Sequence, residues 1–227
     1  MKNIITIITI LLLSNSTYCQ NGVITYIITP TVDLSNEKRA DIHDELELMS
    51  FQLVYNKEKS FFKKNKNVPI KKLASIMASI ASGSKEEIHQ LVNDKKTIYI
   101  SEISSKVYRV VDTSKMNNWK LTNESKIIEN YECYKATLTL FNTRSQKDYI
   151  IEAWYTPQIP VPFGPIGYGG LPGLILELKN RNGFVYTPES IKLNLKKIKI
   201  PKLENAEEIS IKEKLILRKK ERKVTKD

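Results

Sequence analysis

The stretch GPIGYGGLPGLILEL at residues 164–178 carries the most specific pattern of the chain. Within it, residues 171–174 predict a type II turn, because Pro172 fits the second position and Gly173 accepts the positive φ of the third. Leucines then recur at every second position up to Leu178, which is the period of a half-buried β-strand. The stretch therefore predicts a turn and a strand, and the turn contains no acid, base or nucleophile.

The six residues 170–175 read GLPGLI. They resemble the motif that names the GLPGLI family of exported Bacteroidota proteins, and the resemblance extends to AWYTP at 153–157 and YECYKA at 131–136. It is specific over about residues 118–180. Asn130 stands where the family pattern has a glycine, and asparagine also adopts left-handed turns. The resemblance implies an exported protein and no particular activity. The residues that we assign to the structural motif are Gly170, Leu171, Pro172, Gly173, Leu174, Ile175 and Cys133.

The composition predicts one basic, strand-rich domain. Of the 227 residues 41% are hydrophobic, which is enough for one sizeable core. The 11 tyrosines outnumber tryptophan and phenylalanine together, and such a mix favours strands. The formal net charge is +11. It permits anionic partners, or it reflects only a solvated surface and a basic tail.

Residues 1–19 predict a signal peptide. Lys2 gives the positive start, an apolar run interrupted by two threonines follows, and the segment ends in a small-x-small pattern. The run is too short for a permanent membrane helix. We favour cleavage before Gln20; the alternative is a lipoprotein signal with Cys19 acylated, which the bulky preceding tyrosine disfavours. We expect export to the periplasm or cell envelope, or secretion.

Short β segments dominate residues 20–200, which we expect to form a single domain. Their close spacing predicts an antiparallel meander around an apolar interior. The expected fold is mainly β (α+β), a strongly bent antiparallel sheet or half-barrel with a few helices packed on one face, similar to periplasmic lipoprotein carriers. The predicted strands are 23–29, 46–55 with a bulge near Met49, 60–63, 97–101, 106–112, 119–121, 131–140, 149–155, 184–186 and 190–195.

Helices are predicted at three places. Residues 34–45 are polar, with Ser35 as a possible N-cap, and predict a short helix or an ordered loop. Residues 73–92 predict two short helices, the second over 87–92. We interpret this pair as a cover of the core, with a mobile lid as the alternative. The charged residues 201–227 predict a basic tail, either a frayed helix or disordered. The apolar face of the first helix of the pair consists of Leu73, Ile76, Met77 and Ile80.

Catalytic and metal-binding patterns are scarce. The two histidines, His43 and His89, lie in charged segments that we expect to be exposed, and no nucleophile elbow is present. The carboxylates near His43 match no metal-site spacing. The glycine-rich residues 164–173 precede a strand, whereas phosphate cradles precede a helix. We therefore predict no cofactor and no metal. The tail lacks interleaved aromatics, so we predict no nucleic-acid partner either.

Cys133 is the only cysteine expected after removal of the first 19 residues, so it cannot form an intramolecular disulfide. A lone thiol in an exported protein can be a reactive nucleophile or form an intermolecular bridge. No histidine is close to it in sequence. We therefore favour a buried, structural thiol.

The prolines after Tyr155 interrupt regular pairing, so residues 157–170 predict a long, stiff loop that crosses the sheet. Aromatic residues of such a loop can line a groove for a peptide or lipid chain, or they can clamp the loop onto the sheet. The candidate binding residues of the loop and its rim are Trp154, Tyr155, Phe163, Tyr168, Leu171 and Pro172.

These features favour a non-catalytic exported protein that binds a hydrophobic ligand or a protein partner of the cell envelope. One alternative is a structural or interaction protein whose basic tail contacts anionic lipid or lipopolysaccharide. A second alternative is a thiol-dependent enzyme that uses Cys133.

Overall fold

The computed structural model describes residues 21–31, 37–142 and 145–224. The predicted signal peptide, residues 1–19, and the predicted cap Ser35 lie outside these ranges. The strands are β1 (Asn21–Pro30), β2 (Ser50–Asn56), β3 (Lys59–Lys64), β4 (Ile88–Leu91), β5 (Lys96–Ile103), β6 (Lys106–Asp112), β7 (Lys120–Ile128), β8 (Tyr131–Asn142), β9 (Lys147–Thr156), β10 (Leu174–Lys179), β11 (Phe184–Leu193) and β12 (Glu207–Ser210). The helices are α2 (Glu37–Glu47), α3 (Lys72–Ser82) and α4 (Ile211–Val224), with 3-10 turns η1 (Ser114–Met116) and η2 (Pro165–Gly167).

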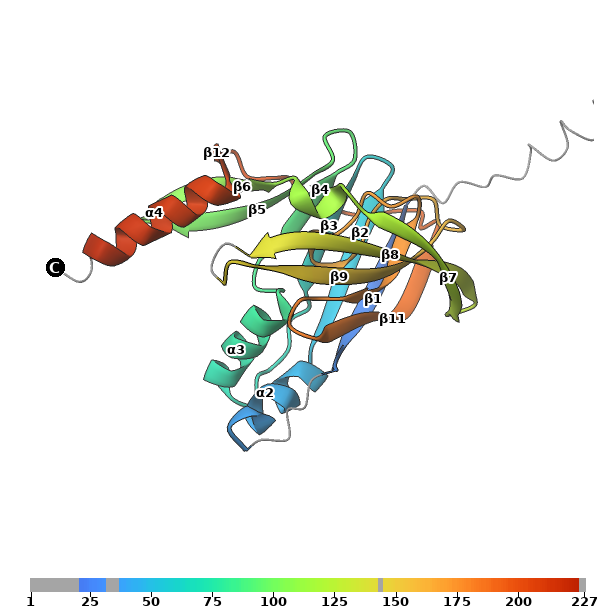
Figure 1. Ribbon diagram of the computed structural model, residues 1–227, viewed down its shortest axis with the longest axis horizontal. Helices are drawn as coiled ribbons and strands as arrows, with labels where there is room; N and C mark the ends of the chain where they lie inside the picture. The colour runs from blue at the N-terminus through green and yellow to red at the C-terminus, as the bar shows by residue number, and fades with distance from the viewer. Residues whose placement is uncertain (1–20, 32–36, 143–144, 225–227) are drawn as a thin grey trace, which may run out of the picture.

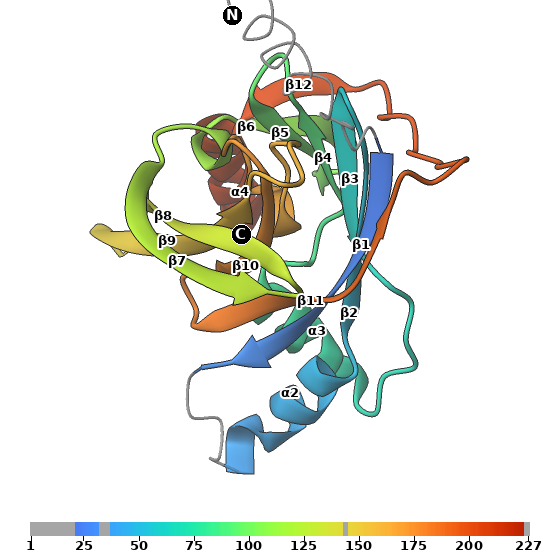
Figure 2. The same ribbon diagram turned by 90° about the vertical axis from the view of Figure 1, so that its right-hand side faces the viewer.

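All these strands belong to one open sheet in the order β12-β6-β5-β4-β3-β2-β1-β11-β10-β9-β8-β7. Neighbouring strands are antiparallel, except that β12 runs parallel to β6. The sheet bends strongly about its centre, β1 and β11, so that β7–β10 curve towards β2–β5 (Figure 2). Helices α2 and α3 lie together at one end of the sheet (Figure 1). The predicted fold class, a strongly bent and mainly antiparallel sheet with a few helices, is confirmed.

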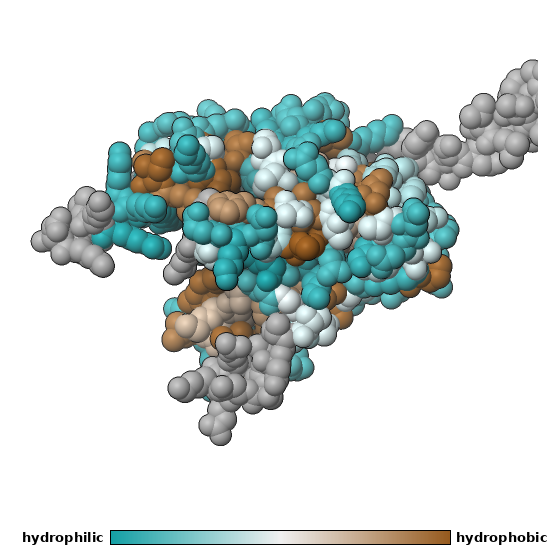
Figure 3. Space-filling model, in the orientation of Figure 1, coloured by the Kyte–Doolittle hydropathy of each residue, from teal (hydrophilic) through white to brown (hydrophobic). Residues whose placement is uncertain are grey.

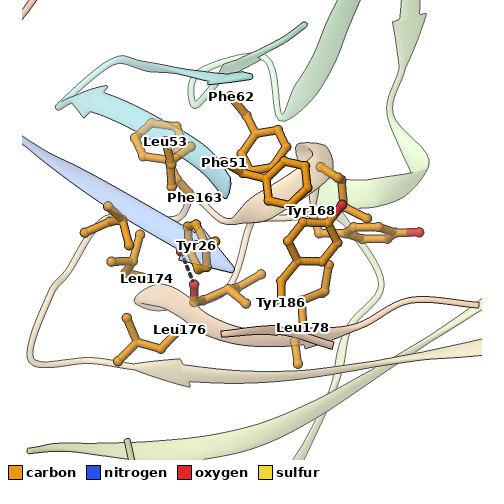
Figure 4. Close-up of a cluster of buried hydrophobic side chains, with 14 of the residues drawn as sticks. Tyr26, Phe51, Leu53, Phe62, Phe163, Tyr168, Leu174, Leu176, Leu178 and Tyr186 are labelled. Carbon is orange, nitrogen blue, oxygen red and sulfur yellow. Dashed lines mark hydrogen bonds between the residues drawn. The ribbon is translucent and has the colours of Figure 1, made fainter. Parts of the chain in front are cut away.

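The interior of the bend is filled with side chains from both halves of the sheet and from the loop between β9 and β10. Tyr26 of β1 lies at its centre and donates a hydrogen bond of 2.6 Å to the carbonyl oxygen of Ile175 (Figure 4). Phe51 packs edge-on against Tyr186, with ring centroids 5.0 Å apart. Phe163 of the loop is fully buried among them. Burial of these large side chains is the main source of the fold's stability.

Three predicted element boundaries are wrong. Helix α2 continues to Glu47, so the predicted strand over 46–55 begins only at Ser50 and has no bulge near Met49. The predicted helix over 87–92 is instead strand β4 (Ile88–Leu91), because pairing with β3 and β5 on both sides satisfies the backbone of this buried segment. The predicted strands 184–186 and 190–195 are one strand, β11, which carries a bulge at Glu189 opposite β1.

The charged C-terminal segment forms β12 and α4, which attach to the outer edge of the sheet (Figure 1). Ile209 of β12 is buried against Ile103 and Val110 of β5 and β6. In α4, Arg218 donates a hydrogen bond of 2.7 Å to the carbonyl oxygen of Glu102. This segment therefore covers the free edge of β6, which would otherwise offer unpaired backbone groups.

Candidate functional site

The GLPGLI residues adopt a different conformation from the predicted type II turn. The amide of Leu174 donates to the carbonyl oxygen of Ile159 at 2.9 Å rather than closing a turn on Leu171. Positive φ occurs at Gly170, with φ +83°, and not at Gly173. A side chain on Gly173 would instead collide with the backbone carbonyl of Thr156. Glycine is therefore required at position 173 for close backbone approach, not for a left-handed conformation.

The predicted long loop is confirmed: it connects β9 to β10 and passes through the interior of the bend. Its backbone is buried, and buried carbonyl groups need hydrogen-bond donors. Four consecutive carbonyl oxygens, at 166–169, accept hydrogen bonds from side chains of four separate segments. The donors are Lys115 Nζ (3.0 Å), Thr97 Oγ1 (2.9 Å), Gln90 Nε2 (2.9 Å) and Trp119 Nε1 (2.8 Å). This set fixes the path of the loop.

The six candidate binding residues do not line a common groove. Tyr155, Phe163, Tyr168 and Leu171 are buried in the main hydrophobic core. Trp154 is half-buried on the other face of β9, with the ammonium of Lys126 4.4 Å from its ring centroid, and Pro172 is exposed. The buried aromatics fill the bend and clamp the loop, which is the alternative considered from the sequence. An interior filled in this way leaves no room for a hydrophobic ligand at these residues.

Cys133 is fully buried, and its thiol lies 3.5 Å from the carbonyl oxygen of Tyr131. Burial raises the pKa of the thiol to about 11. A thiol in this state is a weak nucleophile at neutral pH, because the thiolate is the reactive form. Its position agrees with the buried, structural interpretation.

The two histidines differ in their surroundings. His43 is partly exposed and lies 3.6 Å from Glu47. The expectation of exposure is wrong for His89, which is buried on β4 with its ring centroid 4.8 Å from that of Phe61. Burial lowers its pKa, with further lowering by Lys59 and Arg109, so His89 is neutral at pH 7. Within residues 21–31, 37–142 and 145–224, no three metal-ligating side chains form a cluster.

Helix α3 turns its apolar side to solvent, so the prediction that this side covers the core is wrong. The side chains of Leu73, Ile76, Met77 and Ile80 are 48–68% exposed. The opposite side of α3 consists of alanine and serine and is buried. Small residues allow close packing of α3 on α2, and the carbonyl oxygen of Ser82 accepts a hydrogen bond from the buried Tyr186 hydroxyl at 3.0 Å. The small residues of the buried side are Ala74, Ser75, Ala78, Ser79 and Ser82.

The exposed apolar surface extends into the loop before α3, where Val68 is 88% and Ile70 65% exposed. Figure 3 shows this surface as brown atoms over α3, at the lower left. Monomeric proteins rarely expose such contiguous apolar residues without a binding role. We name it the α3 patch, and it consists of Val68, Ile70, Leu73, Ile76, Met77 and Ile80.

Five lysines lie within residues 63–72, KKNKNVPIKK, which comprise the end of β3, the loop before α3 and the first residue of α3. Lys71 pairs with Asp41 at 2.6 Å. In the part of the chain that the structure describes, the other four form no ion pair. A groove of about 440 Å³ runs beside them, with Ile76 and Pro69 in its apolar wall and both lysine and glutamate at its rim. The α3 patch is therefore apolar at its centre and mainly basic along the preceding loop.

The chain thus defines a class of protein: an open, strongly bent β-sheet with a filled interior and an exposed apolar helix. A family model described as "Protein of unknown function (Porph_ging)" matches residues 140–177, which contain β9 and the buried loop. No curated protein matches the chain. The GLPGLI hexapeptide lies within the matched residues, and membership of the GLPGLI family stays a prediction.

Two solved structures of PNGF-II, in space groups C2 and P21, resemble the chain with a TM-score of 0.55 and 18% sequence identity. The match covers 89% of this chain and 33% or 34% of the solved chains. The chain therefore spans about a third of the length of those proteins. At this identity the likeness concerns the fold alone.

Proposed function

We propose that this protein is a non-catalytic binding protein of the cell envelope that docks on an anionic lipid surface through the α3 patch. The observation that carries this proposal is the orientation of α3, whose apolar side chains face solvent while its small ones face the protein. A helix that buries only alanine and serine gains little free energy from apolar burial within the protein. Its larger apolar side chains are therefore available to another surface.

Charge favours a lipid surface as the occupant. Of the four lysines of residues 63–72 without an ion pair, Lys66 lies in the same loop as Val68 and Ile70, while Lys63 and Lys64 end β3 and Lys72 begins α3. A basic loop with exposed aliphatic tips combines burial of apolar side chains with attraction to anionic headgroups. Each lysine near such a surface contributes about 1 kcal/mol. The net charge of +11 adds a longer-range attraction.

Other surfaces support the proposal less well. The interior of the bend is filled, which argues against a hydrophobic ligand there. The C-terminal segment, which is the lipid contact in the alternative interpretation of the sequence, is partly engaged with the sheet through β12 and α4. The thiol of Cys133 is buried, which argues against the thiol-dependent enzyme. Within the described residues, no helix is both long and apolar enough to cross a membrane.

Vesicle flotation tests the proposal. The full chain, exported and purified from a periplasm, is mixed with vesicles of phosphatidylcholine alone or with 30 mol% phosphatidylglycerol, a composition of about the charge of an anionic leaflet. We expect flotation with the anionic vesicles and its loss at high salt. The double variant Ile76→Ser, Met77→Ser should weaken partitioning at least about tenfold, because each buried aliphatic side chain contributes about 1.5–3 kcal/mol.

The matched control is Ile127→Ser with Ile150→Ser, which removes two exposed aliphatic side chains of β7 and β9, outside the α3 patch. The control should float like the unmodified chain. Equal flotation of all three proteins would contradict the α3 patch as the contact. Capture of a defined envelope protein by the α3 patch without any lipid binding would replace the lipid surface with a protein partner.

A further inference from the structure

A second cavity, of about 210 Å³, lies between the end of α3, η1, β9 and the loop after β10. Two tyrosines form one wall, and each carries a cation on its ring. The Nζ of Lys115 lies 5.1 Å from the ring centroid of Tyr168, and the Cζ of Arg181 lies 5.8 Å from that of Tyr149. The two phenols share a hydrogen bond. The cavity thus brings together two cations and two hydroxyl groups from four separate segments.

The protein offsets the positive charge of this cavity only in part, through the carboxylate of Asp112. Lys115 and Arg181 form no ion pair with any side chain of the described residues. The nearby carboxylate is that of Asp112, and it accepts hydrogen bonds from the amide and the hydroxyl of Ser114. Burial lowers the pKa of Lys115, Asp112 raises it and Arg181 lowers it. A bound anion would relieve this unfavourable placement of charge.

The backbone next to the cavity is strained. Ile166 has φ 45° and ψ 30°, in the left-handed region that β-branched residues rarely adopt. The Nζ of Lys115 donates to its carbonyl oxygen at 3.0 Å and so holds this conformation. Such strain persists where the surroundings fix it, and it concentrates at binding sites. Lys115 therefore has a fixed position at the cavity, with further N–H donors available.

We propose that this cavity binds the phosphate group of a phosphate monoester. A dianion matches two cations, arginine offers paired donors to phosphate oxygens, and lysine acts as a point charge. The hydroxyls of Tyr149 and Tyr168 bond to each other, so one phenolic O–H remains as a further donor. The volume of about 210 Å³ is several times the roughly 30 Å³ of one water molecule, so a phosphate group fits. The monoester has two possible sources, a soluble metabolite or the headgroup of phosphatidic acid. The cavity shares only Ile80 with the α3 patch, and the proposal does not depend on membrane docking.

Calorimetric titration with inorganic phosphate at constant ionic strength tests the site in the full chain. We expect saturable binding with one site per chain. Arg181→Gln should raise the dissociation constant on the order of tenfold or more, because it removes a charged hydrogen-bonding partner. Arg181 is exposed, so this variant should melt like the unmodified protein. Arg222→Gln removes an exposed arginine of α4 and is the matched control, with unchanged affinity expected.

Lys115→Met should weaken binding too, but it removes the donor to the Ile166 carbonyl and lowers stability, so Arg181→Gln carries the test. Vesicles with phosphatidic acid then identify the source: stronger flotation than with phosphatidylglycerol, lost in Arg181→Gln, supports the lipid headgroup. Saturable phosphate binding without this difference supports a soluble monoester. If inorganic phosphate does not bind and Arg181→Gln does not change flotation, the phosphate site is overturned. This holds even if the α3 patch still binds membranes.

Discussion

Gly170 and Gly173 of the loop between β9 and β10 are held in place by close backbone contacts. A side chain on Gly170 would collide with the carbonyl of Met116, and one on Gly173 with the carbonyl of Thr156. The neighbouring Pro172 is exposed and only restricts the chain. Adjacent residues of one motif therefore differ in what they contribute, and their substitutions should have unequal effects.

Gly173→Ala should lower the free energy of unfolding by about 2–3 kcal/mol, because the added methyl group forces the backbone of β9 and the loop apart. Pro172→Ala should cost less than about 1 kcal/mol, mainly through a more flexible unfolded chain. Urea unfolding of both variants measures the difference. Equal destabilisation by the two substitutions would contradict this conformation and would support the type II turn predicted from the sequence.

Cys133 should be inert in the folded protein. Its pKa of about 11 means that little thiolate is present at pH 8, and the side chain is fully buried. A disulfide reagent such as Ellman's reagent should therefore react slowly in buffer and fast in urea. Fast modification in buffer would show that the thiol is accessible and would revive the thiol-dependent enzyme.

At the scale of the element, α3 is an amphipathic helix that packs with its small side inward. Residues Ala74, Ala78 and Ser82 recur at every fourth position and lie against the protein. This spacing permits a close approach to α2, which larger side chains would prevent. The serines of the buried side bond to backbone carbonyls, as Ser79 does to Ser75 at 2.9 Å. The small size of its side chains, rather than their hydrophobicity, therefore decides which side of α3 packs against the protein.

Ala78→Leu should lower the free energy of unfolding by about 1–3 kcal/mol, because the larger side chain is forced into a closely packed contact. Ile76→Ser, on the exposed side, should change it by no more than about 0.5 kcal/mol. Thermal or urea unfolding of the two variants compares them. A larger cost for Ile76→Ser would mean that the apolar side packs against the protein.

The elements differ in how far the sequence predicts them. Alternation of apolar and polar residues located most strands, because each strand of the bend buries one face. It failed at β4, where Ile88, His89 and Gln90 are all buried and no alternation is visible. Helical periodicity also misassigned the buried side of α3. A period of 3.6 residues shows which residues share a side of a helix, but it does not show which side faces the protein. The recurring small residues at 74, 78 and 82 were the available signal.

The phosphate cavity was not predictable by the same means. Its cations and tyrosines are far apart in the sequence, at Lys115, Tyr149, Tyr168 and Arg181, and of these only Tyr168 is a candidate binding residue from the sequence. Only the bend of the sheet and the course of the loop bring them together. The sequence also left open whether the candidate binding residues line a groove, because aromatics of a proline-rich loop fill a core as readily as they line a groove.

At the scale of the whole molecule, the long sheet has two free edges, at β7 and β12. The parallel pairing of β12 with β6 covers a second, smaller apolar cluster around Val110. Helix α4 follows directly and is tied to the β5–β6 hairpin by Arg218 and Glu221. The C-terminal segment is therefore part of the sheet's architecture and protects its edge.

Deletion of residues 207–227 should lower the free energy of unfolding on the order of 2–4 kcal/mol, since it uncovers Ile103 and Val110. It should also promote self-association through the exposed edge of β6. Unfolding and analytical ultracentrifugation measure the two effects, with deletion of 225–227 as the control. A truncated protein as stable and monomeric as the full chain would mean that this segment is dispensable for the fold.

Insertion of the α3 patch into an anionic bilayer is the central claim, and a fluorescent reporter at Met77 measures it directly. Met77→Cys is labelled with an environment-sensitive dye, which the inert Cys133 should not take up, and Thr139→Cys on the exposed side of β8 is the matched control. On addition of phosphatidylglycerol vesicles, emission at residue 77 should shift to the blue and be quenched by brominated acyl chains, while residue 139 should not respond. The same response at both positions, or none at residue 77, would contradict the account.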